Sequence, residues 1–138
     1  MSSLDRFLKA QASSYDSALR EIRAGRKYSH WIWYIFPQIQ GLGFSSTAQY
    51  YAIADLDEAK AYLQEPTLRA RLLEISEALL GLASNDPTQV MGYPDDLKLR
   101  SSMTLFAEAE PECPVFQQVL DKFYGGRKDE RTLQILNR

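Results

Sequence analysis

The sequence predicts an all-α fold, a compact single domain of about eight short-to-medium helices with no substantial sheet. Apolar residues repeat at spacings of three and four along most of the chain, as they do on the buried face of a helix. Serine, aspartate, proline and glycine separate these repeats at positions where helices begin and end. The sequence contains no internal repeat, low-complexity tract or linker. We therefore expect residues 1–138 to form one domain.

In the N-terminal part, serines precede the apolar repeats and can cap the helices that follow. Ser2 and Ser3 precede the first repeat, and Ser14 precedes the second, which Gly25 ends. Pro37 ends a short helix, because the residue before a proline is pushed out of helical geometry. The expected helical segments of this part are residues 4–8, 15–22, 30–36 and 47–53.

In the remainder of the chain, prolines mark where helices begin. Proline suits the first turn of a helix, since its missing N–H would have no partner there. Pro66, Pro94 and Pro114 each precede apolar residues at helical spacing, and Asp55 and Asp129 can cap two further helices. The expected helical segments are residues 56–63, 66–79, a single turn at 87–92, 94–109, 114–123 and a last helix after 129.

The apolar run at residues 31–36 allows a second interpretation. It is rich in aromatic and β-branched residues, which are typical of a buried strand. However, the sequence contains no second run of this kind to pair with it, and an unpaired buried strand would leave its backbone groups unsatisfied. We therefore expect this run to be helical.

Charge and composition limit the class of function. The net charge of −2 argues against a nucleic-acid partner, because dedicated nucleic-acid binders usually carry a basic excess. One cysteine and one histidine cannot form an internal disulfide or a zinc site of several Cys and His ligands. We expect no metal and no cofactor. Residues 1–10 lack the apolar core of a signal peptide, and the longest apolar stretch is far shorter than the roughly 20 residues that span a bilayer. We therefore expect a cytoplasmic protein without a membrane partner.

The first candidate site lies at residues 28–38, which hold both tryptophans and the only histidine. An aromatic wall beside an imidazole can stack a flat ligand, with His30 as the catalytic acid or base. In a helix, His30 would share a face with Trp33 and Tyr34, and Trp31 would share another face with Gln38. The candidate ligand-binding residues here are Trp31, Trp33, Tyr34 and Gln38. Alternatively, the segment is a core helix whose histidine bonds to the backbone.

A second candidate is the glycine-containing segment at residues 41–46, directly before an expected helix. Glycines let a backbone approach a ligand closely, and a helix N-terminus offers free N–H groups to an anion. The segment matches neither a Walker motif nor a nucleophile elbow. The alternative is a loop in which a serine caps the helix.

The third candidate lies at residues 95–106. At helical spacing, Asp95 lies on the same side as a lysine and two serines, opposite an apolar stripe. Serines are poor formers of a helix interior, and such a mismatch is typical of functional sites. The candidate ligand-binding residues are Lys98, Arg100, Ser101 and Ser102, which can hold a phosphate or carboxylate. Alternatively, Asp95 and Lys98 form a solvated pair and Ser101 caps a second short helix.

Residues 29–38, followed by Gly41-Leu42-Gly43 and Tyr51-Ala52-Ile53, resemble the signature of a bacterial family, the domain of unknown function numbered 1810. Residues 95–106 resemble its second motif. The resemblance covers nearly the whole chain and implies an all-α single domain without an established activity. Members are often labelled calpastatin, which acts through disordered repeats. This chain has neither repeats nor a disordered composition, so we discount that label.

Two hypotheses of function follow. In the first, an enzyme or binding protein holds a small anionic or nucleotide-like molecule in a pocket formed by residues 28–46 and 95–106. The aromatic side chains contact its flat part, and the basic and hydroxyl side chains contact its charge. In the second, a non-catalytic module docks a partner protein through an exposed aromatic patch, since Trp, Tyr and Arg dominate binding hot spots.

Overall fold

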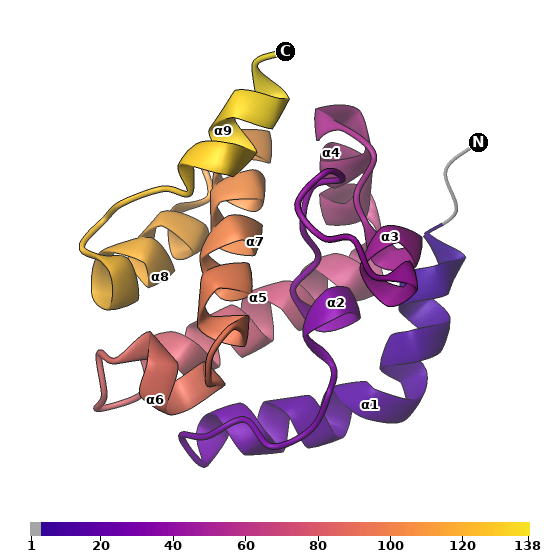
Figure 1. Ribbon diagram of the computed structural model, residues 1–138. Helices are drawn as coiled ribbons and strands as arrows, with labels where there is room; N and C mark the ends of the chain where they lie inside the picture. Colours follow the sequence, from indigo (N-terminus) through magenta and orange to yellow (C-terminus); the bar gives the residue numbers. More distant parts are fainter. Residues whose placement is uncertain (1–3) are drawn as a thin grey trace.

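The computed structural model describes residues 4–138, which contain nine α-helices joined by loops and turns (Figure 1). The helices are α1 (Asp5–Arg23), α2 (Ile32–Ile35), α3 (Ser46–Tyr51), α4 (Leu56–Gln64), α5 (Pro66–Leu80), α6 (Pro87–Met91), α7 (Asp95–Ala109), α8 (Pro114–Tyr124) and α9 (Glu130–Leu136). Within these residues the β-type pairing is one isolated bridge between Ile39 and Ile53. None of the described helices is long and apolar enough to cross a membrane. The expected all-α fold is confirmed. Ser2 and Ser3 lie outside the described residues.

Helix α1 is a single helix of 19 residues, whereas the sequence suggested two segments with a new start at Ser14. Its buried apolar residues are Phe7, Tyr15, Ala18, Leu19 and Ile22. Gln11 continues this face between the two apolar repeats, and its amide donates a hydrogen bond to the Tyr34 carbonyl at 2.8 Å. The Ser14 hydroxyl does not cap a helix but accepts a hydrogen bond from the Tyr34 hydroxyl. The prediction was wrong because a buried glutamine concealed the continuity of the face.

Helix α7 lies at the centre of the fold and packs against α2, α4, α6, α8 and α9 (Figure 1). Residues 101–107 are all buried, including two serines and a threonine. The hydroxyls of Ser101 and Thr104 donate to the carbonyls four residues earlier, so their polarity is satisfied inside the helix. The helix therefore runs through Ser101 without a break, and the alternative of a second short helix starting there is wrong.

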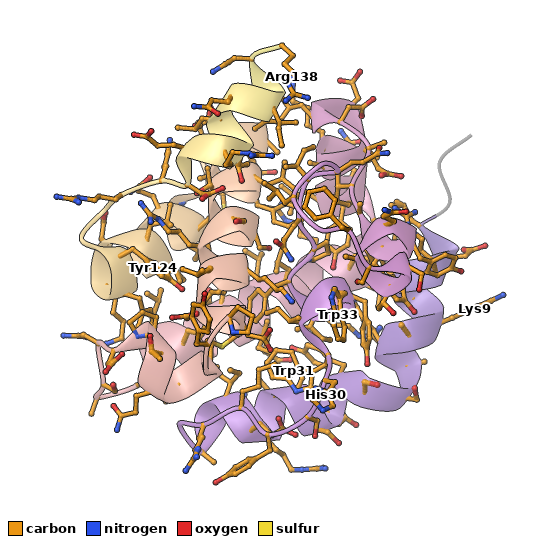
Figure 2. The ribbon with its side chains drawn as sticks, in the orientation of Figure 1. Lys9, His30, Trp31, Trp33, Tyr124 and Arg138 are labelled. Atoms are coloured by element: carbon orange, nitrogen blue, oxygen red, sulfur yellow. The ribbon has the colours of Figure 1, made fainter. Side chains whose placement is uncertain are left out.

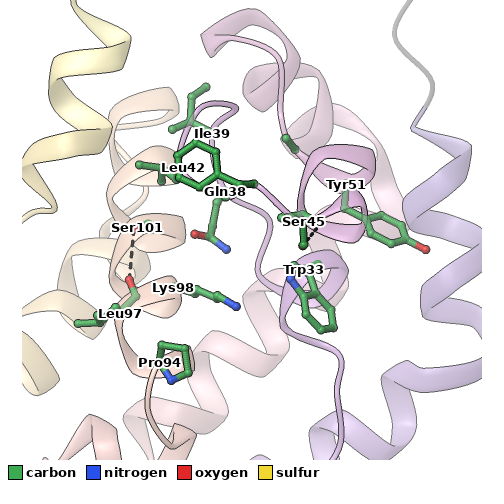
Figure 3. A pocket seen from close by; sticks show the side chains of 14 residues that line it. Trp33, Gln38, Ile39, Leu42, Ser45, Tyr51, Pro94, Leu97, Lys98 and Ser101 are labelled. Atoms are coloured by element: carbon green, nitrogen blue, oxygen red, sulfur yellow. Dashed lines mark hydrogen bonds between the residues drawn. The ribbon is translucent and has the colours of Figure 1, made fainter.

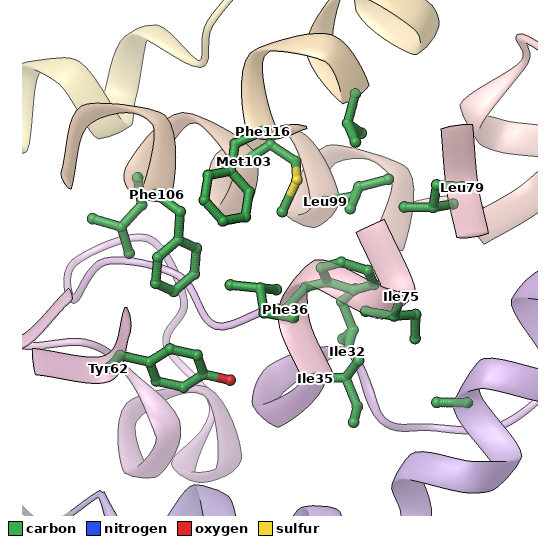
Figure 4. Close-up of a cluster of buried hydrophobic side chains, with 14 of the residues drawn as sticks. Ile32, Ile35, Phe36, Tyr62, Ile75, Leu79, Leu99, Met103, Phe106 and Phe116 are labelled. Carbon is green, nitrogen blue, oxygen red and sulfur yellow. The ribbon is translucent and has the colours of Figure 1, made fainter. Parts of the chain in front are cut away.

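The hydrophobic core joins α7 to the helices around it (Figure 4). The Phe106 ring is central to it, with ring centres of Tyr62 at 5.2 Å and Phe116 at 5.8 Å. Ile32 and Ile35 from α2 are also buried there. The aromatic run at 30–36 is thus helical for one turn only, and its core residues are Trp31, Ile32, Ile35 and Phe36.

Truncation of the Phe106 side chain tests this account of the core. We expect Phe106→Ala to lower the free energy of unfolding by about 3–5 kcal/mol, because it removes a fully buried ring from between two others. Phe44→Ala is the matched control, since Phe44 is 83% exposed, and we expect it to change stability by less than about 0.5 kcal/mol. Urea denaturation followed by circular dichroism measures both. Equal losses in the two variants would contradict the packing.

Candidate functional site

A pocket of about 420 Å³ lies between the N-terminal half of α7 and the segment from α2 to α3 (Figure 3). It brings together parts of the three segments that the sequence singled out. Fourteen residues line it: Trp33, Gln38, Ile39, Leu42, Gly43, Phe44, Ser45, Ala48, Tyr51, Ala52, Pro94, Leu97, Lys98 and Ser101. Ligand pockets in proteins range from about 300 to 1,000 Å³, so this one has room for a small molecule.

Three chemically different groups face the pocket. The Lys98 ammonium lies 5.3 Å from the centre of the Trp33 ring, in the geometry of a cation–π contact. Figure 3 shows the Lys98 side chain directed toward Trp33, with the Gln38 amide pointing into the same space. The site therefore combines a positive charge, an amide that both donates and accepts hydrogen bonds, and an aromatic ring.

Asp95 contacts both Lys98 and Lys27, but not equally. Its carboxylate lies 2.6 Å from Lys27 Nζ and 3.6 Å from Lys98 Nζ. Lys27 is also the more enclosed lysine, since its side chain is 5% exposed and its ammonium lies 4.9 Å from the centre of the Trp31 ring. Lys27 is therefore the main partner of Asp95. Lys98 is paired less closely, and its side chain lines the pocket.

Glu21 holds the chain that leads into α2. Its carboxylate accepts hydrogen bonds from the backbone N–H groups of Tyr28 and Ser29, from the Ser29 hydroxyl and from Trp31 Nε1, at 2.6–3.0 Å. Burial alone would raise the pKa of this carboxyl, but the hydrogen bonds outweigh burial and lower the pKa from 4.5 to about 2. The hydrogen bond to Trp31 holds this core residue in place two positions before Trp33.

Four of the predicted binding residues, Trp33, Gln38, Lys98 and Ser101, line the pocket together. His30 does not: it is exposed and precedes α2, at the level of α1 (Figure 2). The grouping of His30 with Trp33 on one helical face is therefore wrong. It failed because α2 is only four residues long, so helical spacing does not apply to residue 30.

The other predicted residues lie outside the pocket lining. Trp31 is a core residue at 1% exposure. The Tyr34 ring packs against Tyr51 at 5.2 Å and so stands behind the pocket wall. Arg100 is directed elsewhere, donating hydrogen bonds to the carbonyls of Arg127 and Lys128 at 2.9 and 3.0 Å. The buried Ser102 hydroxyl has no hydrogen-bond partner within the described residues.

The segment at residues 41–46 is a loop with a capping serine, as the alternative interpretation had it. The Ser45 hydroxyl accepts a hydrogen bond from the Ala48 N–H at 3.1 Å and caps α3. Gly43 packs so closely on α3 that an added Cβ would lie 2.6 Å from the Ala48 Cβ. The loop thereby forms one wall of the pocket. Elsewhere, within residues 4–138, no group of three or more His, Cys, Asp or Glu side chains is placed to hold a metal.

Sequence reasoning missed the apolar residues of the pocket, in particular Phe44, Tyr51 and Leu97. Leu97 carried a usable signal, because it lies in the polar first turn of α7, away from the buried stripe, and is half exposed. A large apolar side chain in such a position often marks a contact surface.

Comparisons with known proteins agree with the fold and give no activity. A family model described as a protein of unknown function, DUF1810, matches residues 1–136. The crystal structure of the conserved hypothetical protein Rv1873 from Mycobacterium tuberculosis is similar, with a TM-score of 0.96 and 47% sequence identity. The match covers 98% of this chain and 96% of that chain. No curated protein matches the sequence. An experimentally solved bacterial protein therefore shares the arrangement of helices around the pocket.

The Glu21 contacts predict a specific pH dependence. The pKa of Glu21 is lower in the folded chain than its ordinary value of 4.5, so its contribution to stability is present above that value and lost as the pH falls toward about 2. We expect wild type to exceed Glu21→Gln in unfolding free energy near neutral pH, and the difference to shrink between pH 4.5 and 2. Urea denaturation at a series of pH values measures this. A difference that does not change with pH would contradict the role of the charge.

The contact between Gly43 and Ala48 can be tested by a double-mutant cycle. We expect Gly43→Ala alone to cost about 1–3 kcal/mol of stability because the new Cβ overlaps that of Ala48. Ala48→Gly alone costs about 1 kcal/mol as a glycine inside a helix. In the double variant the overlap is gone, so its loss should be smaller than the sum of the two. Additive losses in thermal or urea unfolding would show that the two positions do not touch.

Proposed function

The chain belongs to the DUF1810 family, whose description gives no activity, and we propose that it binds a small anionic or nucleotide-like molecule in the pocket between α7 and the segment from α2 to α3. The observation that carries this proposal is the position of Lys98. Its ammonium lies in a pocket, beside the face of Trp33 and near the Gln38 amide. Asp95 lies 3.6 Å from this ammonium and is bound more closely by Lys27, so it is a weak partner for Lys98. A bound anion would be a stronger partner.

The lining of the pocket supports binding of a molecule that is partly apolar. Leu42, Phe44 and Leu97 contribute apolar surface beside the polar groups. Small-molecule sites commonly combine a mainly apolar lining with a few polar groups that fix the orientation of the ligand. His30, the imidazole considered as a catalytic acid or base, is not among the lining residues. The proposal is therefore binding, and no reaction is part of it. We place this function in the cytoplasm, because a chain with one cysteine has no internal disulfide that would suit an oxidising compartment.

A second candidate function, docking of a partner protein, is favoured by the exposed apolar side chains at the same place. Phe44 and Leu97 line the pocket and are exposed, and Tyr93 is exposed directly before Pro94 of the lining. Large apolar side chains gathered at the surface are typical of interaction sites. Trp31 is excluded from such a patch by its burial.

The substitution Lys98→Met tests the first proposal, because it removes the charge and keeps the alkyl stem. We expect wild type to gain several degrees in melting temperature from at least one member of a panel of nucleotides, sugar phosphates and aromatic carboxylates, since ligand at 100 times its Kd stabilises by about 2.7 kcal/mol. In Lys98→Met the affinity for that compound should fall about tenfold or more, because a hydrogen bond to a charged group is lost.

Lys9→Met provides the matched control, since Lys9 is an exposed lysine on α1, directed away from the fold (Figure 2). It should bind as wild type does, and circular dichroism should show the same helical content in all three proteins. A shift that persists in Lys98→Met, or a panel without any shift at millimolar ligand, would reject the proposal. The second result would favour the interaction module.

A further inference from the structure

The positive charge available in the pocket is limited to Lys98. It is the one charged residue among the described residues that line the pocket. The two other cations close to the candidate segments have their own partners: Lys27 is paired with Asp95, and Arg100 donates hydrogen bonds to two backbone carbonyls before α9. A ligand therefore meets one ammonium group, and not the cluster of basic groups that binds a polyphosphate.

Asp95 sets an upper limit on the negative charge of the ligand. Its carboxylate lies 3.6 Å from Lys98 Nζ, so any anion that contacts the ammonium also lies near this carboxylate. Lys27, whose ammonium lies 2.6 Å from Asp95, cancels the single negative charge of this carboxylate and no further negative charge. A ligand with one negative charge makes this arrangement of two lysines and one aspartate electrically neutral, whereas a second negative charge would have no partner and would be repelled by Asp95.

The remaining surface of the pocket fits a flat, mostly apolar body. The Trp33 indole and the Phe44 phenyl ring both line it, and rings stack well on other flat groups. Phe44 is 83% exposed, so a ligand that covers it removes a large apolar surface from water. The Gln38 amide faces the same space as the ammonium and can supply a second hydrogen-bond donor to a planar anion.

From this combination we infer that the ligand is an aromatic or heteroaromatic monocarboxylate. Its carboxylate lies between the Lys98 ammonium and the Gln38 amide, and its ring lies against Trp33 and Phe44. This inference rests on the proposed function, because it names the chemical class that the same pocket selects. Within the wider class of small anions, it excludes doubly charged phosphate esters and nucleoside polyphosphates as preferred ligands.

Three compounds with one ring system and different charges test the inference. They are naphthoate, with a single negative charge, neutral naphthamide and naphthyl phosphate, which is mainly doubly charged at neutral pH. Isothermal titration calorimetry with the full-length protein gives their affinities. We expect naphthoate to bind about tenfold more tightly than each of the others, because only its single negative charge matches the net charge of +1 that Lys27, Lys98 and Asp95 carry together. In Lys98→Met, naphthoate should lose this advantage and bind as weakly as naphthamide.

The outcomes separate this inference from the proposed function. If naphthyl phosphate or a nucleotide binds wild type as tightly as naphthoate or more tightly, and Lys98→Met removes that binding, the pocket is an anion site but the monocarboxylate inference is overturned. If naphthamide equals naphthoate in wild type, charge selection is absent and the inference is also overturned. If neither these compounds nor the wider panel of anions binds wild type, the proposed function fails together with the inference.

Discussion

The burial of α7 is the constraint on which the rest of this structure depends. Because α7 packs against five other helices, it cannot turn a polar face to solvent over most of its length, so the hydroxyls of Ser101 and Thr104 donate hydrogen bonds to carbonyls of the same helix. Its first turns reach the surface beside the pocket, and Leu97 and Lys98 lie there. The helix that organises the core therefore also holds the pocket lysine on a rigid backbone, as a precise binding site requires.

On the opposite side of the pocket, the loop that leads into α2 is held by charged side chains. The Glu21 carboxylate accepts hydrogen bonds from the backbone N–H groups of Tyr28 and Ser29 and from the indole N–H of Trp31. Lys27, in the same loop, forms an ion pair with Asp95 on α7. These contacts hold Trp31 in the core. Trp33, in the single turn of α2 that follows, lines the pocket. Two tryptophans separated by one residue thus have different roles, one in packing and one in the candidate site.

The fold could be predicted from the sequence because apolar periodicity and capping residues both indicate helices. The start suggested at Ser14 failed because buried Gln11 interrupts the apolar pattern while preserving the helix. For the site, the sequence indicated the three segments that meet at the pocket, but not which of their residues line it. Arg100 donates hydrogen bonds to carbonyls 27 and 28 positions along the chain, and no local pattern reveals such partners. His30 was misplaced because helical spacing was assumed for a segment in which just four residues are helical.

A ligand that binds beside Trp33 and Lys98 should change the environment of one tryptophan and not of the other. The indole N–H signals of Trp33 and Trp31 therefore give a test with an internal control. In a two-dimensional nitrogen–proton NMR spectrum, titration with naphthoate should move the indole signal of Trp33, whose ring lines the pocket. The indole signal of Trp31 should stay in place, because that ring is buried and its N–H is bonded to Glu21 at 3.0 Å. Two unmoved indole signals, or equal shifts of both, at naphthoate concentrations that saturate binding would contradict the account.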